Sequence, residues 1–404
     1  PGPGFERYDQ AYPEPYAYLP AQGIARVSVA SDGAQANGGS VDTSISADGR
    51  YVAFASGASN LVEADTNAVY DIFVHDRQNG ETSRVSLASD GTQANGHPFG
   101  VSISADGRFV AFASQASNLV LEDTNEMRDI FVHDRQTSET TRVSVASDGT
   151  QGNGYSSEVS ISADGRYVAF ASEASNLVEG DTNGVVDVFV HDRQMGETIR
   201  ISVTSDGTQA VGFSSYPSIS ADGCHVAFLS VSDDLVAEDT NSYADIFVHD
   251  CQSGKTTRIS VATDGSQADK SSFLASISAD GRYVAFDSYA SNLVMDDVNS
   301  VEDIFVHDRQ TGETTRISVT SEGIQANGGS GSPFISADGR YVTFVSWANN
   351  LVAGGDANLE GSDIFVHDRQ TGETIRIPGS PAGFQPNNSS YDSSISANGR
   401  VIAF

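Results

Sequence analysis

The chain has 404 residues and carries 54 acidic against 22 basic side chains, which gives a formal net charge of −32. This balance excludes ordinary binding to nucleic acid or to anionic membranes, and it favours cations or basic partners. The sequence contains no run of eighteen apolar residues, so it predicts no membrane insertion.

Residues 1–25 differ in composition from the rest of the chain. Five of the eleven prolines lie within the first twenty residues, interleaved with Tyr8, Tyr12, Tyr16 and Tyr18. A terminal segment becomes ordered only when it packs on a surface. We therefore expect an N-terminal arm that uses these tyrosines to contact its own domain or a neighbouring copy. Within the arm, residues 14–20 could pair as a strand.

A repeat follows the arm. An arginine that opens the sequence RVS or RIS recurs at 26, 84, 142, 200, 258 and 316, and the equivalent arginine after that is at 376. Each unit contains segments typified by VSIS, RYVAFAS, DIFVHD and TRVSVAS, separated by Asp-Gly or Thr-Gly pairs. Alternating apolar and polar residues, β-branched side chains and these turn pairs predict four short strands in every unit.

Repeated four-stranded units predict a β-propeller, because radial repetition leaves only short sheet edges. The segments ADGRYVAF and DIFVHDR resemble the corresponding elements of TolB-type, WD40-like propeller repeats, and the resemblance extends over residues 26–404. It implies an all-β β-propeller of four-stranded blades, and the number of repeats predicts that the β-propeller is seven-bladed. For function it implies only that such repeats serve in binding, docking or gating.

Closure of the ring depends on both termini. The sequence contains seven copies of the first, second and fourth predicted strands but six of DIFVHD. The spacing places the missing strand at residues 14–20, so seven blades would be closed with strands from both ends of the chain. The predicted domains are accordingly the arm, 1–25, and the propeller, 26–404.

The histidines argue against catalysis. Six of the eight occupy the same place in the DIFVHD segment of successive units. A catalytic residue is expected once per site, so a repeated histidine is expected to be structural. The sequence has no nucleophile elbow, zinc-peptidase motif or phosphate-binding loop. We therefore expect a protein that is not an enzyme and has no catalytic residues.

Five loops carry the pattern D-x-N-x-x-x-D, which places oxygen ligands at calcium-loop spacing. The residues concerned are Asp65, Asn67, Asp71, Asp123, Asn125, Asp129, Asp181, Asn183, Asp187, Asp239, Asn241, Asp245, Asp297, Asn299 and Asp303. These loops could bind Ca²⁺. Alternatively, aspartate and asparagine only satisfy the backbone of the loop, as they often do in turns.

Two cysteines replace arginines within one unit. Cys224 and Cys251 stand at positions that the predicted hairpin brings side by side, which favours a disulfide. A disulfide would place the protein outside the cytoplasm, so we expect an extracellular, secreted protein. Asn387 and Asn388 begin overlapping glycosylation sequons.

These features lead to a functional expectation. We expect a secreted, structural or adhesive scaffold, stabilised by calcium, that assembles with itself into oligomers or filaments through the arm and an open seventh blade. Two alternatives remain: a monomeric propeller that binds a carbohydrate or protein, and the propeller domain of a larger hydrolase.

Overall fold

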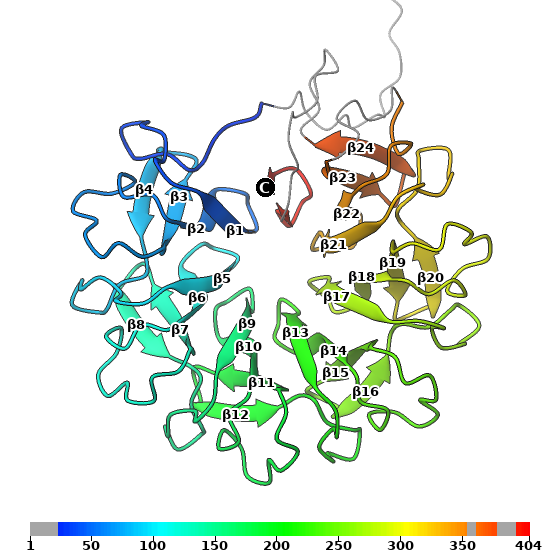
Figure 1. The fold of residues 1–404 in the computed structure, drawn as a ribbon, viewed down its shortest axis with the longest axis horizontal. Helices are drawn as coiled ribbons and strands as arrows, with labels where there is room; N and C mark the ends of the chain where they lie inside the picture. Colours follow the sequence, from blue (N-terminus) through cyan, green and yellow to red (C-terminus); the bar gives the residue numbers. More distant parts are fainter. Residues whose placement is uncertain (1–22, 354–360, 378–392) are drawn as a thin grey trace, which may run out of the picture.

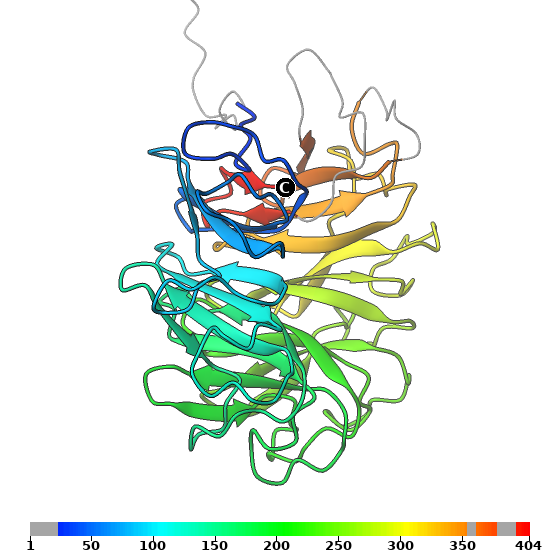
Figure 2. The same ribbon diagram turned by 60° about the vertical axis from the view of Figure 1, so that its left-hand side comes forward.

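A computed structural model describes residues 23–353, 361–377 and 393–404. In these ranges every regular element is a β-strand, and no helix long and apolar enough to cross a bilayer occurs among them. Figure 1 shows the sheets arranged around a central axis, and Figure 2 shows the same ring from the side. The predicted all-β propeller of four-stranded blades is confirmed.

Each of the six blades is an antiparallel sheet whose strands run in chain order from the axis outwards. Blade 1 contains β1 (Ser40–Ile45), β2 (Tyr51–Ser56), β3 (Asp71–Asp76) and β4 (Glu81–Arg84). Blade 2 contains β5 (Pro98–Ile103), β6 (Phe109–Ser114), β7 (Asp129–Asp134) and β8 (Glu139–Arg142). Blade 3 contains β9 (Ser156–Ile161), β10 (Tyr167–Ser172), β11 (Asp187–Asp192) and β12 (Glu197–Arg200).

Blade 4 contains β13 (Ser214–Ile219), β14 (His225–Ser230), β15 (Asp245–Asp250) and β16 (Lys255–Arg258). Blade 5 contains β17 (Ser272–Ile277), β18 (Tyr283–Ser288), β19 (Asp303–Asp308) and β20 (Glu313–Arg316). Blade 6 contains β21 (Ser330–Ile335), β22 (Tyr341–Ser346), β23 (Asp363–Asp368) and β24 (Glu373–Ile377). A separate two-stranded sheet pairs β25 (Ser394–Ile395) with β26 (Ile402–Ala403).

The hydrophobic core lies between blades. In blade 1, Ala55, Ile72 and Val74 pack against Val110 and Phe112 of blade 2, and all of these side chains are buried. The opposite face of the same sheet carries Phe54 and Phe73, whose rings stack with centroids 5.9 Å apart. Period-two alternation therefore gives both faces of each blade an apolar surface, and burial of that surface holds neighbouring blades together.

The turn between the first two strands of each unit builds an inner ring of hydrogen bonds. The backbone N–H of Ala47 donates to the carbonyl of Ala105 in the next blade at 3.0 Å, and the same bond recurs from blade to blade. The last two joints run from Ala337 to Ala397 (3.2 Å) and from Ala397 back to Ala47 (3.0 Å). The loop between β25 and β26 thus fills the position between blades 6 and 1, near the end of the chain marked in Figure 1.

The prediction of seven complete blades is wrong for the described residues, which form six, plus the two-stranded sheet. One reason is the position of the fourth strand. It ends at the repeated arginine, as β4 does at Arg84, and the RVSL segment that begins there then enters a loop held by a bridge between Leu87 and Gln93. The first RVSV, at residue 26, therefore provides no outer strand. The predicted strand at 14–20, the arm tyrosines and the sequons at Asn387 and Asn388 lie outside the described residues.

The predicted disulfide is also wrong, because Cys224 and Cys251 are free thiols. The expected proximity is correct, since the N–H of Cys251 donates to the carbonyl of Cys224 at 2.8 Å. Their side chains have different neighbours. The thiol of Cys224 accepts from Nε2 of Gln252 at 2.9 Å, whereas Cys251 packs against the core between blades 3 and 4. Adjacent backbones therefore do not bring the sulfurs together.

Candidate functional site

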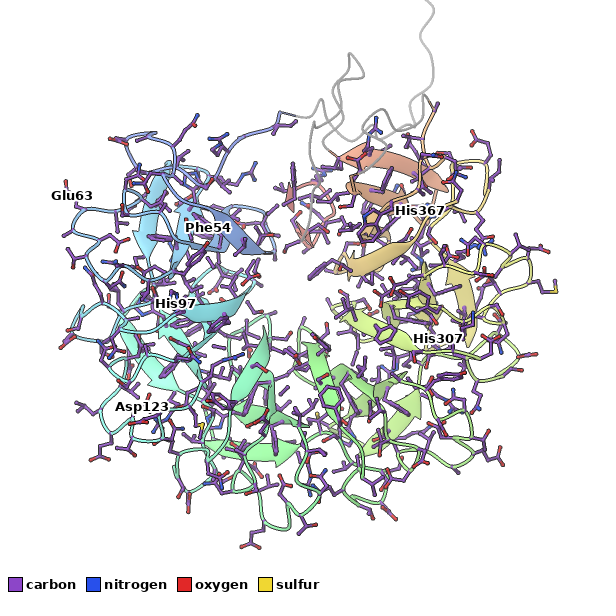
Figure 3. All side chains as sticks on the ribbon, in the orientation of Figure 1. Phe54, Glu63, His97, Asp123, His307 and His367 are labelled. Atoms are coloured by element: carbon purple, nitrogen blue, oxygen red, sulfur yellow. The ribbon has the colours of Figure 1, made fainter. Side chains whose placement is uncertain are left out.

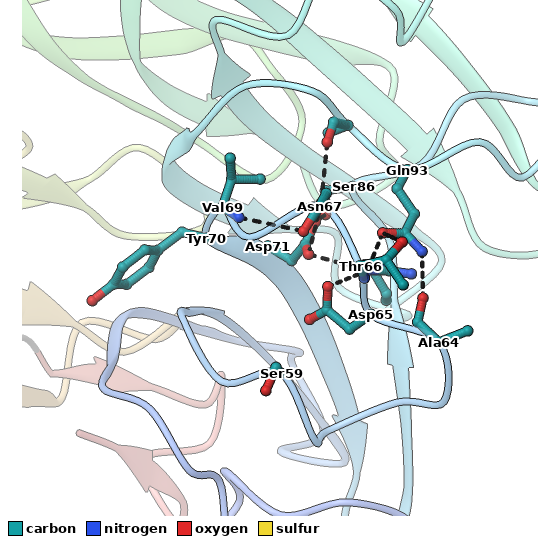
Figure 4. A network of polar contacts seen from close by, with 12 residues as sticks. Ser59, Ala64, Asp65, Thr66, Asn67, Val69, Tyr70, Asp71, Ser86 and Gln93 are labelled. Atoms are coloured by element: carbon teal, nitrogen blue, oxygen red, sulfur yellow. Dashed lines mark hydrogen bonds and ion pairs between the residues drawn. The ribbon is translucent and has the colours of Figure 1, made fainter.

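The five predicted calcium loops form polar networks at the outer ends of the blades, and Figure 4 shows the one in blade 1. Asp71 is fully buried, and its carboxylate accepts hydrogen bonds from Ser86 and from Nδ2 of Asn67. The same amide of Asn67 donates to the carbonyl of Ala94 at 3.1 Å, which ties this loop to the loop that leads into blade 2. Asp65, Asn67 and Asp71 are therefore brought together, as the spacing predicted.

An arginine lies where the cation was expected. Nη1 of Arg84 is 3.1 Å from both Asp65 and Asp71, and its side chain is only 8% exposed. Arg142, Arg200 and Arg258 make the equivalent double contacts in their loops, and Arg316 contacts Asp297. Across the described ranges, no group of three or more acidic, histidine or cysteine side chains could hold a metal ion. The loop residues thus fit a guanidinium, and calcium is not confirmed.

The repeated histidines make structural contacts. His191 is buried, and its Nδ1 lies 2.8 Å from Oγ1 of Thr198 on the neighbouring strand. That threonine in turn donates to the carbonyl of Val145, which precedes the blade, so the contact ties the blade to the preceding loop. Burial lowers the pKa of His191 to about 4. Figure 3 shows two equivalent histidines, His307 and His367, within their sheets.

A pocket of about 430 Å³ between blades 5 and 6 combines acidic and aromatic side chains. We call it the acid–aromatic pocket. It is lined by Tyr216, Phe273, Leu274, Asp287, Tyr289, Glu302, Gly331, Ser332, Val345 and Trp347. Three of these residues, Tyr216, Leu274 and Ser332, also line the central channel, so the pocket opens beside the channel.

The two carboxyls of the pocket approach each other across Gly331. A Cβ atom on that glycine would lie 3.2 Å from Oδ2 of Asp287 and 3.4 Å from Oε2 of Glu302. Other blades carry a side chain at this place in the repeat, namely Val41, Phe99, Ser157, Ser215 and Phe273. The glycine therefore leaves open the space that the carboxyls face.

Asp287 stands in an otherwise apolar position on its strand. The equivalent residues of the other blades are Ala55, Ala113, Ala171, Leu229 and Val345. Asp287 is only 2% exposed, and its Oδ2 accepts a long hydrogen bond of 3.3 Å from the N–H of Ser332. Its Oδ1 has no hydrogen-bond partner among the described residues. A buried carboxyl oxygen without a partner is costly, and such groups concentrate at functional sites.

Both carboxyls hold their protons unusually tightly. Burial, and then the charge of Glu302, raise the pKa of Asp287 to about 8. Burial raises the pKa of Glu302 to about 7. Burial and a neighbouring like charge are the expected causes of such shifts, and carboxyls with shifted pKa values in a cleft mark a candidate site. At neutral pH the pair can both donate and accept a proton.

Aromatic side chains flank the carboxyls. Tyr289 and Trp347 occupy the same repeat position in successive blades and are 43% and 54% exposed. Phe273 meets Tyr289 edge to face, with ring centroids 6.2 Å apart and an interplanar angle of 87°. Exposed ring faces next to buried carboxyls can bind the apolar body and the polar group of one small ligand.

The innermost strands add a second unusual position. Each carries a β-bulge at which the backbone turns to positive φ, at Asp42, Gly100, Glu158, Tyr216, Leu274 and Ser332. These residues differ in every blade, although the surrounding framework is nearly constant. Left-handed backbone conformations at non-glycine residues are strained and are often found at functional sites. The channel surface is therefore specific to each blade.

None of the residues that line the acid–aromatic pocket was predicted from the sequence as a site residue. A signal was available in the columns of the repeat, where Asp287 interrupts a series of apolar residues and Glu302 replaces residues as different as Tyr70, Arg128 and Ala244. The sequence alone gave no indication that these departures face one cavity, because Asp287 and Glu302 come from successive strands of blade 5 and the open space between them depends on Gly331 in blade 6. The fold brings them together.

No protein-family model matches the chain, and no curated protein matches it by sequence. TolB from Acinetobacter baumannii is a similar solved structure, at 17% identity over 76% of this chain and 59% of that chain, with a TM-score of 0.44. This chain therefore spans less than two thirds of that TolB chain.

Two further structures are similar over more of their length. Oligogalacturonate lyase in complex with manganese gives 14% identity over 89% of this chain and 84% of that chain, with a TM-score of 0.53. The β-propeller domain of the Trilobed protease from Pyrococcus furiosus, described as having an open velcro topology, gives 16% identity, 89% and 86% coverage, and a TM-score of 0.52. The resemblance to TolB-type propeller repeats is confirmed at the level of the fold.

The expectation that the protein is not an enzyme is overturned by these neighbours. The lyase is an enzyme, and the second propeller is a domain of a protease. A β-propeller without a familiar catalytic motif can therefore belong to an enzyme, so missing motifs in this sequence do not exclude one.

Proposed function

We propose that the protein is a ligand-binding β-propeller that holds a small organic molecule in the acid–aromatic pocket, beside its central channel. One observation carries the proposal: the side chains that depart from the repeat at Asp287, Glu302 and Gly331 converge on one cavity. A cavity of this size, lined by aromatic rings and a few convergent polar groups, is the usual form of a small-molecule site.

The proposal can be tested with the fluorescence of Trp347. It is the single tryptophan of the chain, and its side chain lines the pocket. We expect at least one probe from a panel of glucose, galactose, tert-butylammonium and acetate to give a saturable change in its emission. The change should be lost in Gly331→Val, which fills the space between the carboxyls. A panel without any saturable change, or a change that persists in Gly331→Val, would overturn the proposal.

A second candidate is an enzymatic role, either in the propeller itself or as the substrate-binding domain of a larger hydrolase. The support is the pair of carboxyls with raised pKa values, which suits general acid–base catalysis, together with the fold shared with a lyase and a protease. Galacturonate itself fits poorly, because no lysine, arginine or histidine lines the pocket to neutralise its carboxylate.

Turnover assays separate the two forms of this candidate. Neutral p-nitrophenyl glycosides and fluorogenic peptides serve as substrates. Turnover that is abolished in Asp287→Ala would place catalysis in the propeller. Saturable binding of the same compounds without turnover would support a substrate-binding domain, and neither turnover nor binding would remove this candidate.

Self-assembly through the arm, and export from the cytoplasm, stay predictions. The arm residues lie outside the described ranges, and the free thiols remove the disulfide that motivated export. Light scattering on the chain with and without residues 1–25 tests assembly. A monomer in both cases would contradict it.

A further inference from the structure

The acid–aromatic pocket contains two acidic side chains without a matching basic one. Of its ten lining residues, Asp287 and Glu302 are acidic, and none is a lysine, arginine or histidine. The central channel beside it is similar, since its only charged lining residues are Asp42 and Glu158. A cleft lined by charges of one sign raises the local concentration of counter-ions. Anionic ligands are therefore disfavoured on charge alone.

The equivalent site in blade 2 contains a cation supplied by the chain. Arg128 stands at the repeat position of Glu302, and Phe99 stands at that of Phe273. The guanidinium of Arg128 lies over the ring of Phe99, 4.5 Å from its centroid. Glu158 lies close enough for the charge of Arg128 to counteract the effect of burial on its pKa. In blade 2, a cation supplied by the chain thus lies over an aromatic face and interacts electrostatically with a nearby carboxyl.

Blade 5 keeps the aromatic ring and the acidic surroundings but replaces this internal cation. Glu302 stands where Arg128 would stand, Asp287 adds a second carboxyl, and Gly331 leaves the space between them open. The unpartnered Oδ1 of the buried Asp287 lacks the donor that such an oxygen requires. The pocket therefore has the acidic and aromatic residues that would surround a cation, but no side chain of the pocket supplies that cation.

We propose that the acid–aromatic pocket binds an organic cation, with an ammonium group held between Asp287 and Glu302 and its alkyl body against Phe273, Tyr289 and Trp347. This inference rests on the proposed ligand-binding function and specifies its ligand class. An ammonium donates to carboxylates and is attracted to ring faces. A divalent metal ion fits less well, because it favours a larger set of hard oxygen ligands and gains little from aromatic walls.

A matched pair of probes tests the charge requirement. tert-Butylammonium and tert-butanol have nearly the same shape and differ in charge. Each is titrated into the protein at constant ionic strength while the fluorescence of Trp347 is followed. We expect saturable binding of the ammonium, at least about tenfold tighter than that of the alcohol, which corresponds to ~1.4 kcal/mol.

Two variants localise the binding. Glu302→Arg installs the cation that blade 2 carries at this repeat position, so we expect tert-butylammonium binding to fall by at least about tenfold, the 1.4 kcal/mol of one decade in affinity. Its circular dichroism and melting temperature would verify that it folds. Glu173→Gln is the control: Glu173 is exposed, lies outside the pocket and occupies the repeat position of Tyr289 and Trp347 in blade 3. This control should bind like the wild type.

The outcomes distinguish this inference from the function on which it rests. Equal binding of tert-butanol, or binding of glucose without the ammonium, would overturn the cation proposal and leave ligand binding intact. Saturation by Mn²⁺ or Ca²⁺ without ammonium binding would also overturn it, in favour of a metal. If no probe binds, the proposed function fails as well. Unchanged ammonium binding in a folded Glu302→Arg variant would show that the cation binds elsewhere.

Discussion

Asp287 occupies a strand position at which three of the other blades carry alanine. We expect Asp287→Ala to make the protein more stable near neutral pH, by about 1–3 kcal/mol in the free energy of unfolding, because it removes a buried and incompletely bonded carboxyl. Urea denaturation of both proteins measures the difference. A destabilised variant would mean that the carboxyl has a favourable partner in the folded protein.

The stability difference between Asp287→Ala and the wild type should depend on pH. The pKa of Asp287 is raised to about 8 from 3.8, so the folded protein binds this proton more tightly than the unfolded chain. The free-energy cost of burying the ionised Asp287 carboxylate is therefore absent below pH 3.8. It grows as the pH rises and is complete above about pH 8. Glu302 and Tyr289 face the same carboxyl. We expect the advantage of Asp287→Ala to be larger at pH 8 than at pH 5, and equal advantages would contradict the shift.

Gly331 controls access to the carboxyls. Its φ is not among the positive values, so a side chain is compatible with the backbone, and blade 1 carries Val41 at this position. We expect Gly331→Val to fold with a melting temperature close to that of the wild type and to lose ligand binding because its side chain fills the pocket. Thermal melts and Trp347 titrations check the two parts. A variant that folds and still binds the ligand would show that Gly331 does not control access to the carboxyls.

At the scale of single elements, the loop after the second strand depends on an arginine in each of blades 1 to 5. The substitution Arg84→Gln removes the guanidinium and leaves Asp65 and the buried Asp71 without their cation. Breaking a buried ion pair in this way should cost about 3–5 kcal/mol. The vacated site should then gain from calcium, so millimolar CaCl₂ should raise the melting temperature of the variant more than that of the wild type.

Arg50→Gln provides the control for this prediction. Its ion pair with Asp76 is 2.6 Å long, but the arginine side chain is 37% exposed. Because this arginine is accessible to solvent, we expect its pair with Asp76 to stabilise the fold less than the buried network around Arg84 does. If Arg84→Gln is no more destabilising than Arg50→Gln, the buried network is not the stabilising element. If calcium stabilises the wild type as strongly as Arg84→Gln, the arginine does not occupy the cation site.

The repeated histidines act together on the third strand of each blade. Burial lowers the pKa of His133, His191 and His367 to about 4 from 6.5. The unfolded chain therefore binds these protons first, and stability present above pH 6.5 is lost as pH falls towards 4. Asp245, Asp287 and Glu302 have raised pKa values and therefore the opposite trend, so the histidine contribution is measured as the change in the slope of melting temperature against pH when one histidine is replaced. The melting temperature of His191→Asn should fall less steeply with decreasing pH than that of the parent protein. An equal slope would contradict the assignment.

The strands could be predicted because the sequence pattern of a strand is local. The acid–aromatic pocket could not be predicted in this way, because its residues come from separate strands. Alternation in segments such as RYVAFAS, and Asp-Gly pairs between them, specified which residues pair. The fourth strand was misplaced because the same alternation continues past Arg84 into a loop. The disulfide prediction failed although strand register brings the backbones of Cys224 and Cys251 together, since one thiol contacts Gln252 and the other packs on the core. The arginine between Asp65 and Asp71 comes from a strand nearly twenty residues later in the sequence, so the loop pattern alone suggested a metal.

At the scale of the whole molecule, the short sheet β25–β26 completes the ring. Ala403 and Val401 pack on Ile45 and Val52 of blade 1, and Ala397 provides two joints of the inner ring. We expect a chain shortened to end at Ile377 to expose these contacts and to melt at a lower temperature. Hydrogen exchange should increase most in β1, β2, β21 and β22, and least in blade 3, opposite the opening. Uniform loss of protection would contradict this.

The inner ring of alanine hydrogen bonds has a consequence for how such a molecule can change size. The bonds at all seven joints are 2.9–3.2 Å long, so no joint is visibly stretched to accommodate the others. The angle between neighbours is therefore set collectively. Insertion or loss of one unit by recombination would alter the angle at every joint at once, instead of adding local strain at the point of insertion. The number of repeats is therefore fixed by the ring as a whole. Sequence changes within single repeats should be tolerated more readily than a change in the number of repeats.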